Sequence, residues 1–125
     1  MSKHETPLTR RYWEEVGGTL LEEFPAVRKR QDRGKRLLDA VILPDGPNLT
    51  AKAKDVEITD QNIVIVQTKA YRLGMYLLGQ ALFSIHLMEP FLPRSIQSVA
   101  ICTKGDAVLE PLAQKYGIKV VIYPD

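Results

Sequence analysis

The chain has 125 residues, a length that suits one domain and is short for two. Hydrophobic residues make up 45% and charged residues 26%, which excludes a disordered or collagen-like chain, and the single cysteine excludes an internal disulfide and a zinc site of the CxxC type. The longest apolar stretch, residues 74–88, is interrupted by polar residues and is too short for a membrane span. We therefore expect a single domain over residues 1–125 that is soluble and cytoplasmic, with no membrane partner.

The net charge of +2 conceals one strongly basic segment, RKRQDRGKR at residues 28–36. Six of its residues are positive and one is negative, so the rest of the chain is net negative. Two interpretations stay open: a solvated loop, or a loop that contacts phosphates, because clustered cations supply the sequence-independent part of nucleic-acid binding. The candidate phosphate-binding residues are Arg28, Lys29, Arg30, Arg33, Lys35 and Arg36.

The spacing of apolar residues predicts a first helix from about Thr9 to Glu22, with Thr9 as its N-cap and with Gly17 and Gly18 weakening its interior. An extended segment is expected to follow at residues 24–28, because Pro25 helps to end the helix.

Apolar runs rich in β-branched residues predict the later strands, which are expected at residues 37–43, 62–70, 95–103 and 118–123. Helices are expected at residues 74–89 and 106–116, and the first of them is apolar almost all round and is therefore expected to be buried. The order α-β-β-β-α-β-α-β predicts a mixed β-sheet with helices on both faces. Its last β-α-β unit requires parallel pairing there.

Asp39 lies inside the apolar run LLDAVIL, where a carboxylate is costly to bury unless a partner compensates it. Gln67 and Lys69 end the strong strand NIVIVQTKA and share one face, since residues two apart in a strand point the same way. If the two strands are neighbours, a carboxylate, an amide oxygen and an ammonium group meet at one end of the sheet. Such a group can bind a divalent cation and a phosphate. The alternative interpretation is a capped strand end with a surface lysine and a hydrogen-bonded glutamine.

The pattern of Asp39 in one strand and Gln67-Thr68-Lys69 at the end of the next resembles the PD-(D/E)XK nuclease superfamily. The resemblance covers roughly residues 9–103 and rests more on the order of the elements than on identity. It implies an α/β fold with a restriction-endonuclease-like core of order αβββαβ, extended here by a C-terminal αβ unit. Two features depart from the pattern: Leu38 stands where a proline is usual, and Gln67 stands at the acidic position.

The resemblance implies a metal-dependent nuclease that hydrolyses phosphodiester bonds of nucleic acid, DNA rather than RNA, with Mg²⁺ or Mn²⁺ as cofactor. Asp39 and Gln67 would hold the metal, and Lys69 would orient the water or neutralise the phosphate. A second acidic ligand would come from the first helix: Glu14, Glu15, Glu22 and Glu23 are candidates, and Glu15 is preferred because it lies in mid-helix near the edge of the apolar stripe. Superfamily members are often dimers, and the helix from Gly74 is a candidate for part of a homodimer interface.

Residues after the lysine extend this expectation. Tyr71 and Arg72 are candidates for contact with phosphate or bases. Tyr76 and Gln80 lie one turn apart on the apolar helix and are candidates to support the lysine, and their alternative is a stripe that faces water or a second subunit. Two alternatives to the enzyme stay open: a nuclease-like domain that binds nucleic acid without cutting it, and a protein-interaction module.

Overall fold

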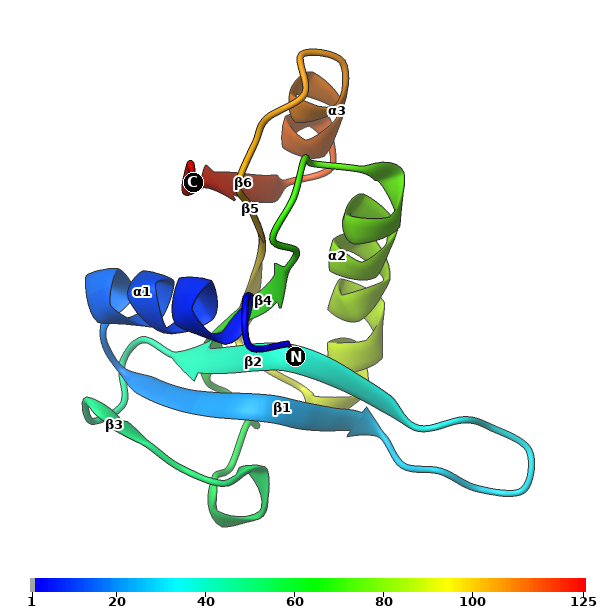
Figure 1. Ribbon diagram of the computed structural model, residues 1–125. Helices are drawn as coiled ribbons and strands as arrows, with labels where there is room; N and C mark the ends of the chain where they lie inside the picture. The colour runs from blue at the N-terminus through cyan, green and yellow to red at the C-terminus, as the bar shows by residue number, and fades with distance from the viewer. Residues whose placement is uncertain (1) are drawn as a thin grey trace.

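The structure is a computed structural model that describes residues 2–125, which form a six-stranded mixed sheet with three α-helices. The elements in chain order are α1 (Thr6–Val16), β1 (Thr19–Val27), β2 (Arg36–Leu43), β3 (Leu49–Thr50), η1 (Ala53–Asp55), β4 (Asn62–Thr68), α2 (Met75–Met88), η2 (Glu89–Phe91), β5 (Ser95–Cys102), α3 (Leu109–Lys115) and β6 (Ile118–Ile122). The strands lie side by side in the order β3-β1-β2-β4-β5-β6 (Figure 1). Pairing is antiparallel from β1 through β2 to β4 and parallel from β4 through β5 to β6. This confirms the predicted α/β class and the mixed sheet with its parallel C-terminal part.

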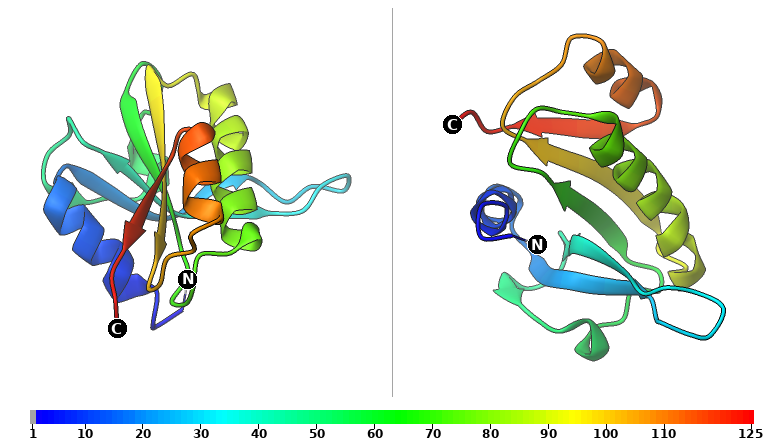
Figure 2. Two further views of the ribbon diagram at one scale, coloured as in Figure 1. Left: turned by 90° about the horizontal axis from the view of Figure 1, so that it is seen from above. Right: turned by 45° about the vertical axis from the view of Figure 1, so that its right-hand side comes forward.

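Helices cover both faces of the sheet, as predicted (Figure 2). On one face α1 packs through Tyr12 on apolar residues of β1, β2, β4 and β5. On the other face α2 packs through Leu77 and Ala81, and α3 packs beside it through Ala113. The strand β4 is in the middle of the sheet and its apolar residues are buried on both faces, which agrees with the near-continuous apolar run in its sequence.

The first helix runs from Thr6 to Val16, so it begins before Thr9 and ends well before Glu22. It is therefore shorter than predicted. Gly17 and Gly18 have φ of 78° and 85°, a region that favours glycine, and a Cβ on Gly18 would overlap the carbonyl oxygen of Leu43. The two glycines therefore end the helix and let the chain turn closely against β2. The prediction of helix up to Glu22 was wrong, since those residues belong to β1.

The helix α2 is buried on one side only, which corrects the expectation of a buried helix. Leu77, Ala81, Ser84 and Met88 face the sheet, whereas Met75 and Phe83 are exposed. Among residues 2–125, no helix has the length and the apolar character needed to cross a bilayer.

Candidate functional site

Asp39 lies at the point where β2 and β4 separate. The ladder between these strands runs through Ala40, which pairs with Val66, and beyond that pair the backbone N–H of Thr68 donates instead to Oδ2 of Asp39 at 2.8 Å. The two strands are neighbours, which was the condition for the predicted convergence with Gln67 and Lys69. The carboxylate of Asp39 thus takes the place of a backbone carbonyl as the acceptor for the Thr68 N–H. Thr68 stands between Gln67 and Lys69 in the sequence.

The local fold explains why Asp39 can point into this gap. In β2, Ala40 belongs to the core under α1, whereas Leu38, two residues away, belongs to the core under α2. Residues two apart in a regular strand point to the same face of the sheet, whereas Leu38 and Ala40 point to opposite faces. The regular alternation of β2 is therefore interrupted at Asp39. Glu23 of the neighbouring strand β1 lies opposite Asp39 and has a φ of 50°. The alternation of β1 is interrupted there as well, because Leu20 and Phe24 belong to the cores on opposite faces.

The pKa of Asp39 is raised, first because burial disfavours the charged carboxylate. The hydrogen bond from the Thr68 amide and the charge of Lys69 act in the opposite direction, and the charge of Glu5 raises the pKa further. A carboxylate that is short of compensating charge attracts a cation. Asp39 is therefore the strongest candidate here for a cation ligand.

Gln67 is buried on the α2 side of β4, where its Nε2 donates to Oγ of Ser84 at 2.9 Å. This bond directs the amide nitrogen towards α2 and leaves the amide oxygen, the atom that binds a cation, to face elsewhere. Gln80 lies one turn before Ser84, and its Oε1 is buried without a hydrogen-bond partner among the described residues. The predicted polar stripe of α2 therefore borders Gln67.

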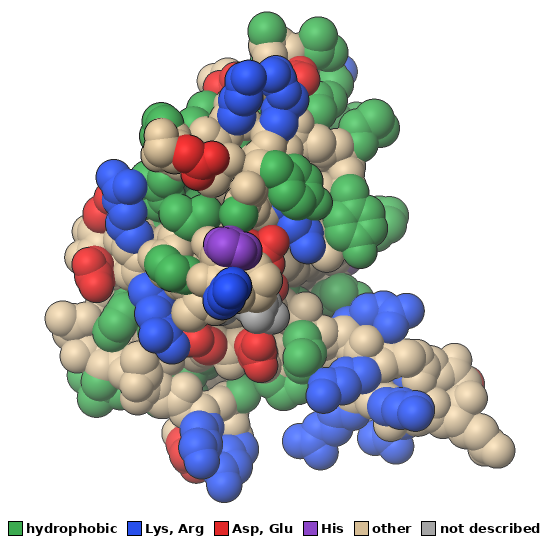
Figure 3. All heavy atoms as spheres, viewed as in Figure 1, with side chains coloured by type: hydrophobic (Ala, Val, Ile, Leu, Met, Phe, Trp, Pro, Cys, Tyr) green, Lys and Arg blue, Asp and Glu red, His purple; other side chains and the backbone are tan. Residues whose placement is uncertain are grey.

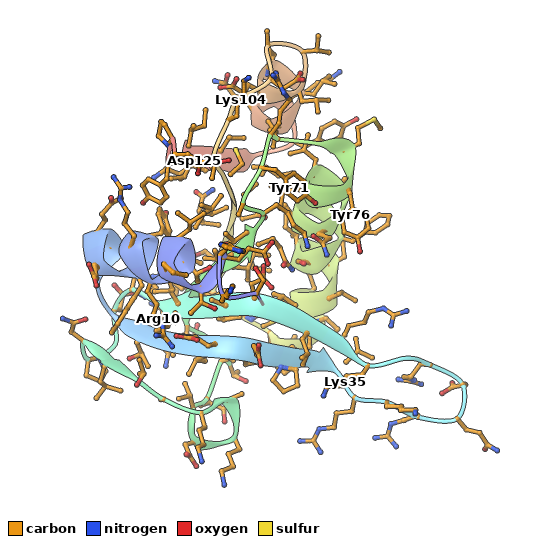
Figure 4. All side chains as sticks on the ribbon, in the orientation of Figure 1. Arg10, Lys35, Tyr71, Tyr76, Lys104 and Asp125 are labelled. Carbon is orange, nitrogen blue, oxygen red and sulfur yellow. The ribbon has the colours of Figure 1, made fainter. Side chains whose placement is uncertain are left out.

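Lys69 follows the last residue of β4 and is half-buried. Its backbone N–H donates to the carbonyl of Ile101 at 2.9 Å, so the neighbouring strand β5 holds the chain in place just where the side chain leaves the sheet. Its Nζ lies 5.5 Å from the centre of the Tyr76 ring, a distance at which the ring attracts the cation. Tyr76 projects outward from α2 in Figure 4 and is the aromatic neighbour of this lysine.

The structure does not bring Glu15 to this group. Its Oε2 accepts a hydrogen bond from the Tyr123 hydroxyl at 2.7 Å, and Arg11 lies at 3.8 Å from its other oxygen. The charge of Glu5, the N-cap residue of α1, does act on Asp39. Glu5 precedes Glu15 by ten residues, which is about 15 Å along the helix axis. The sequence contained one usable signal: Pro7 favours a helix start at or just before it, which makes Glu5 the residue at the N-terminal end of α1.

The six basic residues of segment 28–36 are all exposed. Arg36 is the first residue of β2, and the other five lie on the connection between β1 and β2, a hairpin arm that extends away from the body of the protein (Figures 1 and 3). Within the arm, Arg30 and Arg33 form a two-residue antiparallel bridge. Arg33 pairs with Asp32 at 3.1 Å, whereas ion pairs to the other five cations are absent among the described residues. The arm therefore presents a net charge of +5 to a partner.

Tyr71 and Arg72 lie apart from the arm. Tyr71 is exposed and lines a hollow of about 510 Å³ together with Glu5 and Thr103. Arg72 donates through Nη1 to the carbonyl of Gly105 at 3.3 Å, so part of its role is to hold the loop after β5. Gln67 lines a different hollow, of about 650 Å³, with Tyr76, Gln80 and Ser84 of α2. The candidate site therefore lies between two hollows.

The residues present fit a hard divalent cation that keeps most of its waters. Within residues 2–125, no three His, Cys, Asp or Glu side chains are grouped so that they could hold a metal by themselves. Mg²⁺ does not need such a group, since proteins commonly bind it through one or two carboxylates together with substrate phosphate. Asp39 and the amide oxygen of Gln67 are donors of that kind.

Comparison of the chain with models of known protein families, with curated proteins and with solved structures found no match.

Proposed function

We propose that this chain is a metal-dependent nuclease with a restriction-endonuclease-like core, acting on phosphodiester bonds of nucleic acid, DNA in the first place. One observation carries the proposal: the Asp39 carboxylate is held by the Thr68 amide, between Gln67 and Lys69 of the neighbouring strand. The adjacency of β2 and β4 supports the motif that the sequence suggested. A buried carboxylate with a raised pKa is also typical of a functional site.

Each residue then has a defined task. Asp39 and the amide oxygen of Gln67 would hold a Mg²⁺ or Mn²⁺ ion. When bound, the ion supplies Lewis-acid stabilisation of the charge that develops on the phosphate and lowers the pKa of an attacking water. Lys69, whose position the Tyr76 ring supports, neutralises the phosphate or orients that water.

The charge of the arm is evidence for a polyanionic substrate. Five of its cations lack ion-pair partners among the described residues, and they project from a body that is otherwise net negative. Phosphate contacts of this kind give affinity without sequence preference. The arm therefore accounts for binding, and the Asp39 group accounts for cleavage.

The test is cleavage of labelled DNA and RNA duplexes, single strands, junctions and flaps with Mg²⁺ or Mn²⁺. Asp39→Asn is the main variant, because the amide oxygen can still accept the Thr68 N–H while the negative charge is lost. Glu15→Gln is its matched control, since it removes a carboxylate that the structure places with Tyr123. We expect metal-dependent cleavage by the wild type and by Glu15→Gln, and none by Asp39→Asn. Cleavage that survives Asp39→Asn would contradict the proposal.

A second candidate function is nucleic-acid binding without cleavage. It is favoured by the neutral Gln67 at the acidic position and by its hydrogen bond to Ser84, which is what a purely structural glutamine would make. This alternative predicts that the wild type retards nucleic acid at low salt but cuts no substrate with either metal.

A further inference from the structure

One side of α2 forms a wall of the hollow of about 650 Å³ that Gln67 also lines, and this wall carries two exposed aromatic rings. Tyr76, Gln80, Phe83 and Leu87 belong to the wall and recur at helical spacing, so they share one side of the helix. Tyr76 is 71% exposed and Phe83 is 69% exposed. Large apolar surface that is left in solvent at a hollow marks a place for a ligand.

The charges beside these rings are positive. Arg36 lines the same hollow, at the end where β2 begins. Nζ of Lys69 lies 5.5 Å from the centre of the Tyr76 ring, which still has most of its surface open and projects from α2 in Figure 4. A base that stacks on Tyr76 therefore has a cation within reach of its phosphate, and that cation is the lysine of the proposed cleavage site.

A second hollow, of about 320 Å³, joins the first one to the arm. The two hollows share His86 and Leu87 of α2, and three cations of the arm line the second hollow: Arg28, Arg30 and Arg33. Among the described residues, no Asp or Glu lines either hollow, although the chain has 15 acidic residues. Asp32 and Glu89 pair with Arg33 and His86 from outside these linings. A path with aromatic and cationic walls thus leads from the arm to the candidate site.

We propose that this path binds a single-stranded segment of nucleic acid, with bases stacked on Tyr76 and Phe83 and phosphates at the neighbouring cations. The inference rests on the proposed function and names the substrate class of that site. Aromatic rings beside a cationic groove are the combination that binds single strands without sequence preference. In a duplex the bases stack on one another and only their edges are open in the grooves, so a ring can cover the face of a base only where the strand is unpaired.

The spacing of the two rings suits this ligand. Tyr76 and Phe83 are seven residues apart, which is about 10 Å along the helix axis. Neighbouring nucleotides of a stacked strand are about 3.4 Å apart, so each ring can take a base of its own. Gln80 lies between the rings, and its Oε1 is buried without a hydrogen-bond partner among the described residues. A ligand with N–H groups, as bases have along their edges, can complete this amide.

The test compares the affinities for a labelled oligothymidylate and for a labelled blunt duplex, measured by fluorescence anisotropy in EDTA so that nothing is cut. The duplex has the higher charge density, so a preference for the single strand must come from its bases. We expect the wild type to bind the single strand about 5-fold or more tightly than the duplex. Phe83→Ala should lower the single-strand affinity about 5-fold or more and leave the duplex affinity unchanged, because stacking is lost and no charge is.

Two further variants separate stacking from a general effect of the substitution. Phe83→Tyr keeps an aromatic ring and should bind the single strand as the wild type does. Tyr116→Ala is the matched control, since it removes a ring that is 57% exposed on the C-terminal side of α3, outside both hollows, and it should also bind as the wild type does. A 2-aminopurine within the thymidine strand reports stacking directly: the wild type should quench its fluorescence, and Tyr76→Ala combined with Phe83→Ala should not.

Several results would overturn the proposal: no binding of the single strand, equal or tighter binding of the duplex, or a single-strand affinity that Phe83→Ala leaves unchanged or that Tyr116→Ala lowers equally. Because the binding assay contains no metal, its outcome is independent of cleavage. Tighter binding of the duplex together with metal-dependent cleavage would refute this inference and leave the nuclease in place. Preference for the single strand without cleavage by either metal would uphold the inference and refute the nuclease.

Discussion

The arm should make nucleic-acid binding strongly dependent on salt, and the structure sets the size of the effect. Each phosphate that a cation neutralises on duplex DNA contributes about −0.9 to the slope of log K against log salt concentration. Arg33 is paired with Asp32, so five cations are available and the arm's slope is about −4.5. Between 50 and 200 mM salt, affinity should therefore fall about 500-fold.

Replacement of Arg28, Arg30 and Lys35 by Gln tests this reasoning. All three are exposed, and the variant leaves Lys29 and Arg36 to bind phosphate, so the slope should shrink to about −1.8 and the loss of affinity over the same range to about 12-fold. The assay is fluorescence anisotropy of a labelled duplex at a series of salt concentrations, without divalent metal. The control variant replaces Lys52, Lys54 and Lys115, which changes the net charge equally on other elements. Equal slopes for the two triple variants would refute the assignment of binding to the arm.

Three further predictions concern stability. Burial raises the pKa of Asp39 in the folded state, so its contribution to stability is present below the pKa of the unfolded chain and is lost as pH rises through the folded pKa. The free energy of unfolding of the wild type should therefore fall relative to that of Asp39→Asn between acid and neutral pH. An equal pH dependence of the two unfolding free energies, measured in urea, would contradict this. Ser84→Ala leaves the buried Nε2 of Gln67 without a partner and should cost about 1–2 kcal/mol, whereas adding Gln67→Leu should recover most of that loss. Gly17→Ala should cost about 1–3 kcal/mol for its backbone conformation, and Gly18→Ala more, because its Cβ also meets Leu43; equal midpoints in guanidinium chloride would argue against the close approach.

The strands β2, β4, β5 and β6 were predictable because each carries its own local signal, whereas β3 and the first half of β1 were not predicted. The run IVIV of β4 is apolar without alternation, as expected for a strand buried on both faces, and the structure places it in the middle of the sheet. The first helix was predicted less well, since helical spacing of Leu20 and Leu21 continues the pattern of α1 although both residues belong to β1. The positive φ of Gly17 and Gly18 decides between the two interpretations, and it depends on the contact with β2, which local periodicity does not contain.

In the candidate site, too, some features had a local sequence signal and others depend on contacts between distant parts of the chain. The proximity of Asp39 to the Gln67–Lys69 segment followed from two strong strands and the assumption that they are neighbours. The partner of the Asp39 carboxylate, however, is a backbone amide, which no side-chain motif records. Glu15 was preferred for its place beside the apolar stripe of the first helix, but its carboxylate is bonded to Tyr123 in the structure. The charge that acts on Asp39 is that of Glu5, at the N-terminal end of α1.

The most direct test of the central claim is to locate Mn²⁺ on the protein by the paramagnetic broadening of its NMR signals. Substoichiometric Mn²⁺ should first broaden the signals of the Thr68 backbone amide and the Gln67 side-chain amide. Excess Mg²⁺ should reverse the effect, and Asp39→Asn should abolish it. Broadening that is confined to other acidic surface residues, or that is unchanged in Asp39→Asn, would contradict the assignment of the cation to this site.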